Sequence, residues 1–123
     1  VCAYVCPVHA ITMIDRDSGF AYISETRFGP MAHAVLNTAE EASGKLVTVV
    51  RNNAKHLAEE KKKDLILIDG PPGIGCPVIA SITGVDLVLI VTEPTLSAIH
   101  DLERVLGVAQ HFHIPAVVCI NKS

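Results

Sequence analysis

The stretch DLILIDGPPGIG, from Asp64 to Gly75, decides the fold that the sequence predicts. A charged residue, four branched aliphatic residues and an aspartate lead into a turn rich in glycine and proline. This order is typical of a buried parallel strand that brings Asp69 to the sheet edge where open α/β proteins bind ligands. Asp69 is suited to hold a cation, and the glycines let the backbone approach a phosphate. The stretch also fits an ordinary turn after a strand, so both interpretations stay open.

The composition indicates one domain with an aliphatic core. The chain has 123 residues, of which 50% are hydrophobic and only 4% aromatic. A net charge of -3 gives no reason to expect nucleic acid as a partner. No apolar run approaches the roughly 18 residues of a membrane span, and no signal peptide is recognisable. We therefore expect a cytoplasmic protein with reduced cysteines and no membrane segment.

The first residues, VCAYVCPVHAI, contain a possible remnant of an iron–sulfur motif. Three residues separate Cys2 from Cys6, and Pro7 follows, as in the closing half of the bacterial ferredoxin run C-x2-C-x2-C-x3-C-P. Thiolates are soft ligands that suit iron. The alternative is a pair of incidental thiols near a terminus. Cys2 and Cys6 are predicted as a partial ligand set, because two thiolates do not complete a 4Fe-4S cluster.

The rest of the chain alternates between predicted strands and helices. Two short apolar stretches before residue 37 form either an edge pair of strands or an extended arm. Ser43 is a plausible N-cap of a helix that ends near Lys63. Strands that alternate with helices in the second half indicate right-handed crossovers and a parallel sheet. The predicted helices there are 76–83 and 97–112, and the predicted strands are 64–69, 86–92 and 116–120.

Polar residues follow the second and third of these strands. Glu93 and Pro94 come after one, and Asn121 and Lys122 after the other. Because the carboxyl ends of parallel strands share one edge, we expect all four near Asp69. An asparagine–lysine pair after an apolar strand suits a purine site, since the amide both donates and accepts hydrogen bonds. A plain surface turn explains the pair equally well. We interpret Cys76 and Cys119, outside these strand ends, as small buried residues.

Several segments together resemble one protein family. They are VCAYVCP, TRFGPMAHAVL, SGKLVTVVR, DLILIDGPPGIGCPV, VTEPTLSAIHDLERV and INK, in this order along nearly the whole chain. The set is similar to the MinD/ParA superfamily of P-loop ATPases, and more narrowly to its branch with an inserted ferredoxin-like domain. The resemblance implies a parallel-sheet, Rossmann-like three-layer P-loop NTPase fold that is incomplete at its N-terminus. Residues 1–12 would be a remnant of the insert, and residues 13–123 part of the ATPase domain.

The resemblance also implies roles at the nucleotide. Asp69 corresponds to the Walker B aspartate, which helps hold Mg2+ through water. Pro72 and Gly73 belong to switch II, where the amide of Gly73 reaches the γ-phosphate.

Pro94 corresponds to a position beside the base or the dimer partner. Asn121, with Lys122, matches the residue that reads adenine. The implied cofactors are ATP, Mg2+ and a 4Fe-4S cluster, and the implied partners are a second copy of the chain and an iron–sulfur or redox protein.

The sequence departs from this family at its phosphate-binding loop. The deviant Walker A motif, a glycine-rich loop with two lysines, is absent, and phosphoryl transfer depends on that cradle. We therefore expect the C-terminal portion of a MinD-type ATPase that is inactive in isolation and exposes a sheet edge where the missing strand belongs. The competing hypothesis is a non-catalytic iron–sulfur binding or scaffold module. The third hypothesis is a degenerate α/β domain without a ligand.

Overall fold

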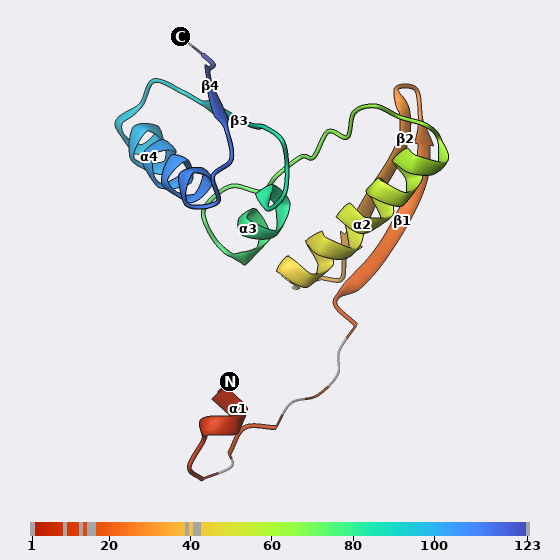
Figure 1. Ribbon diagram of the computed structural model, residues 1–123. Coiled ribbons are helices and arrows are strands. Elements are labelled where there is room, and N and C mark those ends of the chain that lie inside the picture. Colours follow the sequence, from red (N-terminus) through yellow and green to blue (C-terminus); the bar gives the residue numbers. More distant parts are fainter. Residues whose placement is uncertain are drawn as a thin grey trace.

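The computed structural model describes residues 2–8, 10–12, 14, 17–38, 40 and 43–122, with the backbone alone for Cys2. The chain is a mixed α/β protein with two small sheets, one antiparallel and one parallel. A short helix α1 lies apart from the other elements (Figure 1). The elements in order are α1 (Cys2–Val5), β1 (Gly19–Thr26), β2 (Gly29–Leu36), α2 (Gly44–Glu60), α3 (Cys76–Ile82), β3 (Val88–Thr92), α4 (Leu96–His111) and β4 (Ala116–Ile120).

β1 and β2 form a regular antiparallel hairpin. Gly19 pairs with Leu36 at the open end and Thr26 with Gly29 at the turn. The backbone of Gly29 has a φ of 130°, which glycine adopts without strain, and the Thr26 hydroxyl donates a 2.7 Å hydrogen bond to its carbonyl. Of the two alternatives for this region, the pair of strands is therefore confirmed.

α2 begins where the sequence predicts it. The Ser43 hydroxyl accepts a 3.2 Å hydrogen bond from the Leu46 N–H, which satisfies one of the unpaired donors at the helix start. The helix packs against both β2 and α3. Leu57 is its buried anchor, with 8% of its surface exposed. α2 thus joins the hairpin to the second half of the chain.

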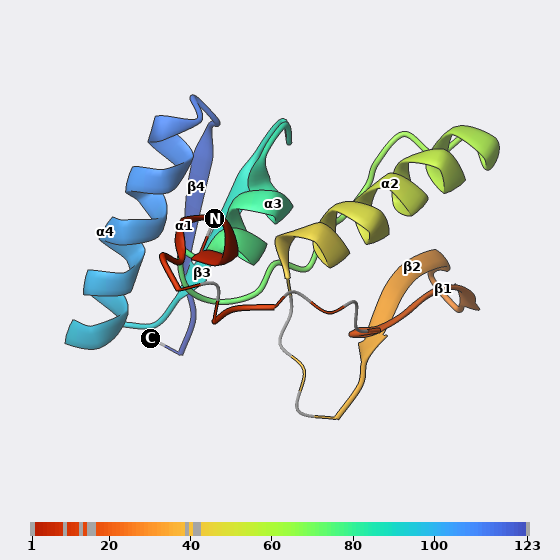
Figure 2. The same cartoon turned by 90° about the horizontal axis from the view of Figure 1, so that it is seen from below.

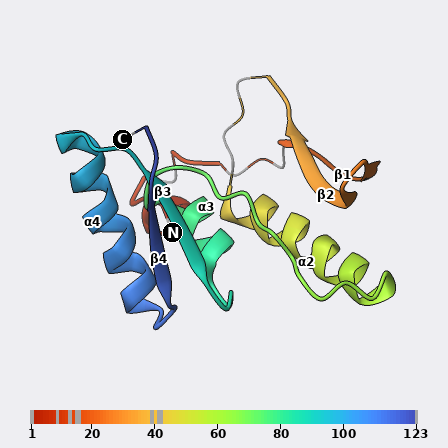
Figure 3. The ribbon, with the colours of Figure 1, turned by 90° about the horizontal axis from the view of Figure 1, so that it is seen from above.

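The second half is built around a parallel strand pair. β3 and β4 pair from Val88 with Ala116 to Thr92 with Ile120, joined by α4. Figures 2 and 3 show the two strands side by side between α4 and α3. Val78, Ile82 and Ile114 form the buried cluster, and Val85, Val88, Val108 and Phe112 pack against it. The core therefore lies between α3, the end of α4 and one face of β3.

The predicted strand at 64–69 is absent. This segment runs from α2 to α3 without pairing to any described strand, and Leu65 and Leu67 are 80% and 91% exposed. A strand needs a neighbour whose backbone groups complete its hydrogen bonds, and no described strand lies against this one. The expected continuous parallel sheet is therefore reduced to the β3–β4 pair.

The prediction that Cys76 and Cys119 are buried is also wrong. Both are exposed, because Cys76 begins α3 and the outer side of β4 is uncovered. None of the described helices is long and apolar enough to cross a membrane.

Candidate functional site

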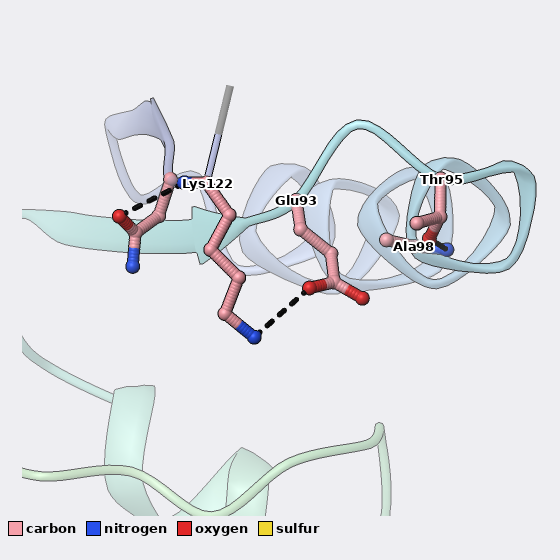
Figure 4. A network of polar contacts seen from close by, with 5 residues as sticks. Glu93, Thr95, Ala98 and Lys122 are labelled. Atoms are coloured by element: carbon pink, nitrogen blue, oxygen red, sulfur yellow. Dashed lines mark hydrogen bonds and ion pairs between the residues drawn. The ribbon is translucent and has the colours of Figure 1, made fainter.

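A cluster of interacting polar residues lies at the carboxyl ends of β3 and β4. The Asn121 N–H donates a 2.7 Å hydrogen bond to the Thr92 carbonyl, which continues the parallel ladder by one residue. Beside it, Lys122 Nζ lies 3.2 Å from Glu93 Oε2 (Figure 4). The prediction that these two strand ends share an edge is confirmed.

The backbone of Lys122 turns sharply after β4. Its φ is 58°, and its N–H donates a 3.0 Å hydrogen bond to Asn121 Oδ1. The Asn121 side chain is thereby held against its own turn through its oxygen. Its Nδ2 donates to no described residue, so the amide presents a hydrogen-bond donor for a ligand.

The charges at this edge are balanced. The side chains of Lys122 and Glu93 are 74% and 43% exposed, so their ion pair is screened by water and contributes at most about 1 kcal/mol to stability. Because Glu93 offsets the charge of Lys122, the pair is a poor phosphate clamp. An amide donor, an ammonium group and a carboxylate are better suited to the polar edges of a base or a ribose.

The turn after β3 is tied into the helix that follows. The Thr95 N–H donates a 2.8 Å hydrogen bond to the Glu93 carbonyl. The Thr95 hydroxyl accepts one of 3.2 Å from the Ala98 N–H (Figure 4). Thr95 is thus the N-cap of α4. Pro94, predicted beside the base or a partner, is exposed within this turn.

The loop that carries Asp69 is solvent-exposed. Asp69 makes no hydrogen bond or ion pair with another residue in the described part of the chain, and Pro72 is also exposed. Gly73 has a φ of 93°, a conformation that side chains disfavour, although a Cβ there would meet nothing within 4 Å. Backbone conformation, not space, therefore requires glycine at this position.

The structure brings the predicted residues together in part. Polar interactions join Glu93, Asn121 and Lys122, whereas no hydrogen bond or ion pair joins Asp69 or Gly73 to them in the described structure. Their shared nucleotide site stays a prediction.

The cysteine motif is placed only in part. The side chain of Cys2 lies outside the described structure. The Ala10 N–H donates a 3.3 Å hydrogen bond to Cys6 Sγ. Among the described residues, no three His, Cys, Asp or Glu side chains gather in a way that could hold a metal ion. The iron–sulfur assignment of Cys2 and Cys6 therefore also stays a prediction.

Two contacts were missed from the sequence. Glu93 was expected near Asp69, but its ion pair with Lys122 was not predicted, although opposite charges after neighbouring parallel strands are a signal for it. Arg51 donates from Nη1 to the carbonyls of Ala80 and Thr83, at 2.6 and 2.8 Å. The signal for Arg51 was a charged residue on the otherwise apolar face of a helix.

Known proteins match this chain over most of its length. The uncharacterized protein MJ0578 of Methanocaldococcus jannaschii is 37% identical over 109 residues, which cover 89% of this chain and 38% of the relative. The uncharacterized protein MJ0579 of the same organism is 28% identical over 112 residues, which cover 91% of this chain and 40% of the relative. The septum site-determining protein MinD of Bacillus subtilis is 29% identical over 92 residues, which cover 73% of this chain and 33% of the relative.

The chain is distantly similar to MinD. It spans between a third and two fifths of the length of these relatives. No protein-family model matches the chain, and no solved structure matches it significantly. The MinD-like relationship therefore rests on sequence similarity.

Proposed function

We propose that this chain supplies the metal-contacting loop and the base-contacting edge of a MinD-type ATPase switch. In such a switch, ATP binding and hydrolysis control association with a second copy of the protein. The similarity to MinD and the family resemblance of the motifs support this proposal. The observation that carries it is the polar edge at the ends of β3 and β4, where Asn121 and Lys122 adjoin Glu93.

The chemistry of Asp69 fits a role at Mg2+. Its carboxylate is exposed and unpaired among the described residues, so its oxygens are available to accept hydrogen bonds from the waters that Mg2+ retains. When bound, Mg2+ neutralises charge on the transferring phosphate. Gly73 is exposed, has no side chain of its own and has a φ of 93°, and a glycine lets its backbone amide approach a phosphate closely.

A substitution of Asp69 tests the proposal. In the intact gene product that carries this chain, we expect Asp69→Asn to lower MgATP turnover by about 100-fold or more, because the metal loses its charged partner. Asp64→Asn, at the other end of the same exposed segment, is the matched control and should keep turnover within about twofold. Wild-type turnover in Asp69→Asn, or no MgATP binding by the unaltered protein, would refute the proposal.

The base-contacting edge is tested separately from the phosphates. We expect Asn121→Ala to weaken ATP binding about tenfold, since one hydrogen bond to the base is lost, while inorganic tripolyphosphate binds as before. If ATP and tripolyphosphate lose affinity equally, Asn121 either contacts the phosphates or is needed for folding, and it does not contact the base.

This chain alone should hydrolyse no ATP, because its sequence has no glycine-rich loop with a phosphate-binding lysine.

A secondary proposal concerns iron–sulfur binding by the first residues. The C-x3-C-P spacing and the N–H donated to Cys6 Sγ favour it, since hydrogen bonds to sulfur tune such clusters. Two thiolates are half of a 4Fe-4S set, so a cluster takes its other ligands from elsewhere. Anaerobic reconstitution of the intact gene product should produce the broad visible absorption of a cluster, and Cys6→Ser should reduce it. Identical iron content in both proteins would contradict this assignment.

A further inference from the structure

Arg51 binds the C-terminal end of α3. It is half-buried in the middle of α2, and Nη1 donates to the carbonyls of Ala80 and Thr83 at 2.6 and 2.8 Å. The last carbonyls of a helix have no partner within the helix, and the negative end of its dipole favours a cation. A guanidinium group that reaches two of these carbonyls therefore holds the end of α3 in place.

A second contact fixes the other end of α3. Gly44, the first residue of α2, packs so closely on Cys76 that a Cβ at Gly44 would lie 3.1 Å from the Cys76 carbonyl oxygen. The two helices therefore run in the same direction and touch at both ends of α3. α3 has only seven residues and no side-chain cap at Gly75. A helix this short is not stable alone, so it depends on its packing against α2.

α3 in turn sets the loop that precedes it, Gly70–Gly75. The Gly75 carbonyl accepts a 3.1 Å hydrogen bond from the Ile79 N–H, which anchors the end of the loop to the first turn of the helix. At the start of the loop, a Cβ on Gly70 would lie 3.3 Å from Oγ of Ser81, a buried residue of the same helix. Both ends of the loop therefore follow the position of α3.

We propose that Arg51 is a positioning residue for the Gly70–Gly75 loop, acting by holding α3 against α2. Its importance for turnover rests on the proposed function of that loop, but the mechanical link does not. Arg51 itself lies at the far end of α3 from Gly75 and acts only through the helix. Movement of the loop is thereby also passed to α2, and through α2 to the β1–β2 hairpin on which it packs.

Amide hydrogen exchange on this chain tests the link without any nucleotide. The Thr83 N–H bonds to the Ile79 carbonyl at the end of α3, whereas the Ile79 N–H bonds to Gly75 at the loop. Arg51→Met keeps much of the side-chain stem but removes the donors. We expect about tenfold faster exchange at both amides, because the short helix opens as a unit once its end is released. Faster exchange at Thr83 with unchanged exchange at Ile79 would overturn the proposal.

Lys55→Gln provides the matched control. Lys55 is an exposed residue one turn further along α2, and its replacement should leave both amides unchanged. A comparable increase in Lys55→Gln would show that any change in α2 loosens α3, and would also overturn the specific role of Arg51. If Arg51→Met does not fold, Arg51→Gln, whose shorter amide reaches fewer carbonyls, is measured with the same two probes and judged by the same outcomes.

A second measurement addresses the reaction. In the intact gene product, Arg51→Met should lower MgATP turnover about tenfold while MgATP affinity changes less than about twofold, because a misplaced loop impairs the reacting geometry more than binding. Unchanged turnover would overturn the catalytic importance of this positioning. If the unaltered protein does not bind MgATP, the proposed function fails, and the exchange result still decides the link between Arg51 and the loop.

Discussion

Two segments with nearly the same sequence pattern adopt different structures in this chain. Leu65–Asp69 and Val88–Glu93 are both apolar runs that end in an acidic residue before a turn with proline. The second becomes β3, pairs with β4 and packs Val88 against the core. The first remains unpaired, and Leu67 is 91% exposed.

The difference shows that strand propensity alone does not make a strand. Aliphatic β-branched residues suit a pleated surface only when another strand and a covering layer are present. The crossover helix α4 brings β4 beside β3. The two strands therefore pair their backbone groups and bury apolar side chains at the same time. No described strand does this for Leu65–Asp69, and an apolar segment left open in this way favours association.

The largest expected effect is the difference in stability between placing a charge in β3 and placing one in the unpaired segment. Val88→Asp should lower the free energy of unfolding by about 3 kcal/mol, because the carboxylate would be placed against the Val78–Ile82–Ile114 cluster. Leu67→Asp should change it by less than about 0.5 kcal/mol, since water already surrounds that side chain. Urea unfolding of both variants measures the difference. An equal loss in Leu67→Asp would mean that this segment is buried in solution.

A smaller effect is expected at the helices that follow the two segments. α4 begins at Thr95, whose hydroxyl caps it, whereas α3 begins at Gly75 without a side-chain cap. Thr95→Ala should cost about 1 kcal/mol, and Gly75→Ser should add a few tenths of a kcal/mol, because its backbone is already extended and a Cβ there meets only an ordinary contact with Pro77. Thermal or urea unfolding checks that Thr95→Ala lowers stability and that Gly75→Ser raises it. A destabilising Gly75→Ser would show that the turn before α3 needs glycine for another reason.

The smallest effect concerns the acids at the ends of the two segments. Glu93→Gln should lower stability by no more than about 1 kcal/mol, because its ion pair with Lys122 is exposed. Asp69→Asn should leave stability unchanged, since Asp69 has no partner among the described residues. A double-mutant cycle of Glu93→Gln with Lys122→Gln isolates the pair. A coupling energy indistinguishable from zero in 10 mM salt would show that the two strand ends are held by the backbone alone.

Much of the chain from Ser43 onward could be predicted from the sequence. Ser43 marked the start of α2, the period of apolar residues indicated α4, and the apolar run before Asn121 became β4. These features depend on local rules, namely capping and periodicity. The segment at 64–69 was mispredicted because pairing is not local. The pairing of Glu93 with Lys122 and the contacts of Arg51 also required knowing which elements lie side by side.

The sequence by itself determined the helices α2 and α4, the glycine-rich turn after Asp69 and the polar residues that follow β3 and β4. It did so because helix caps, turn conformations and strand-end residues are set by neighbours in the chain. Only the tertiary structure decided which apolar run is covered, that Glu93 and Lys122 meet, and that Arg51 reaches the carbonyls at the end of α3. Those outcomes depend on burial and hydrogen bonds between distant residues, which exist only once the elements have packed.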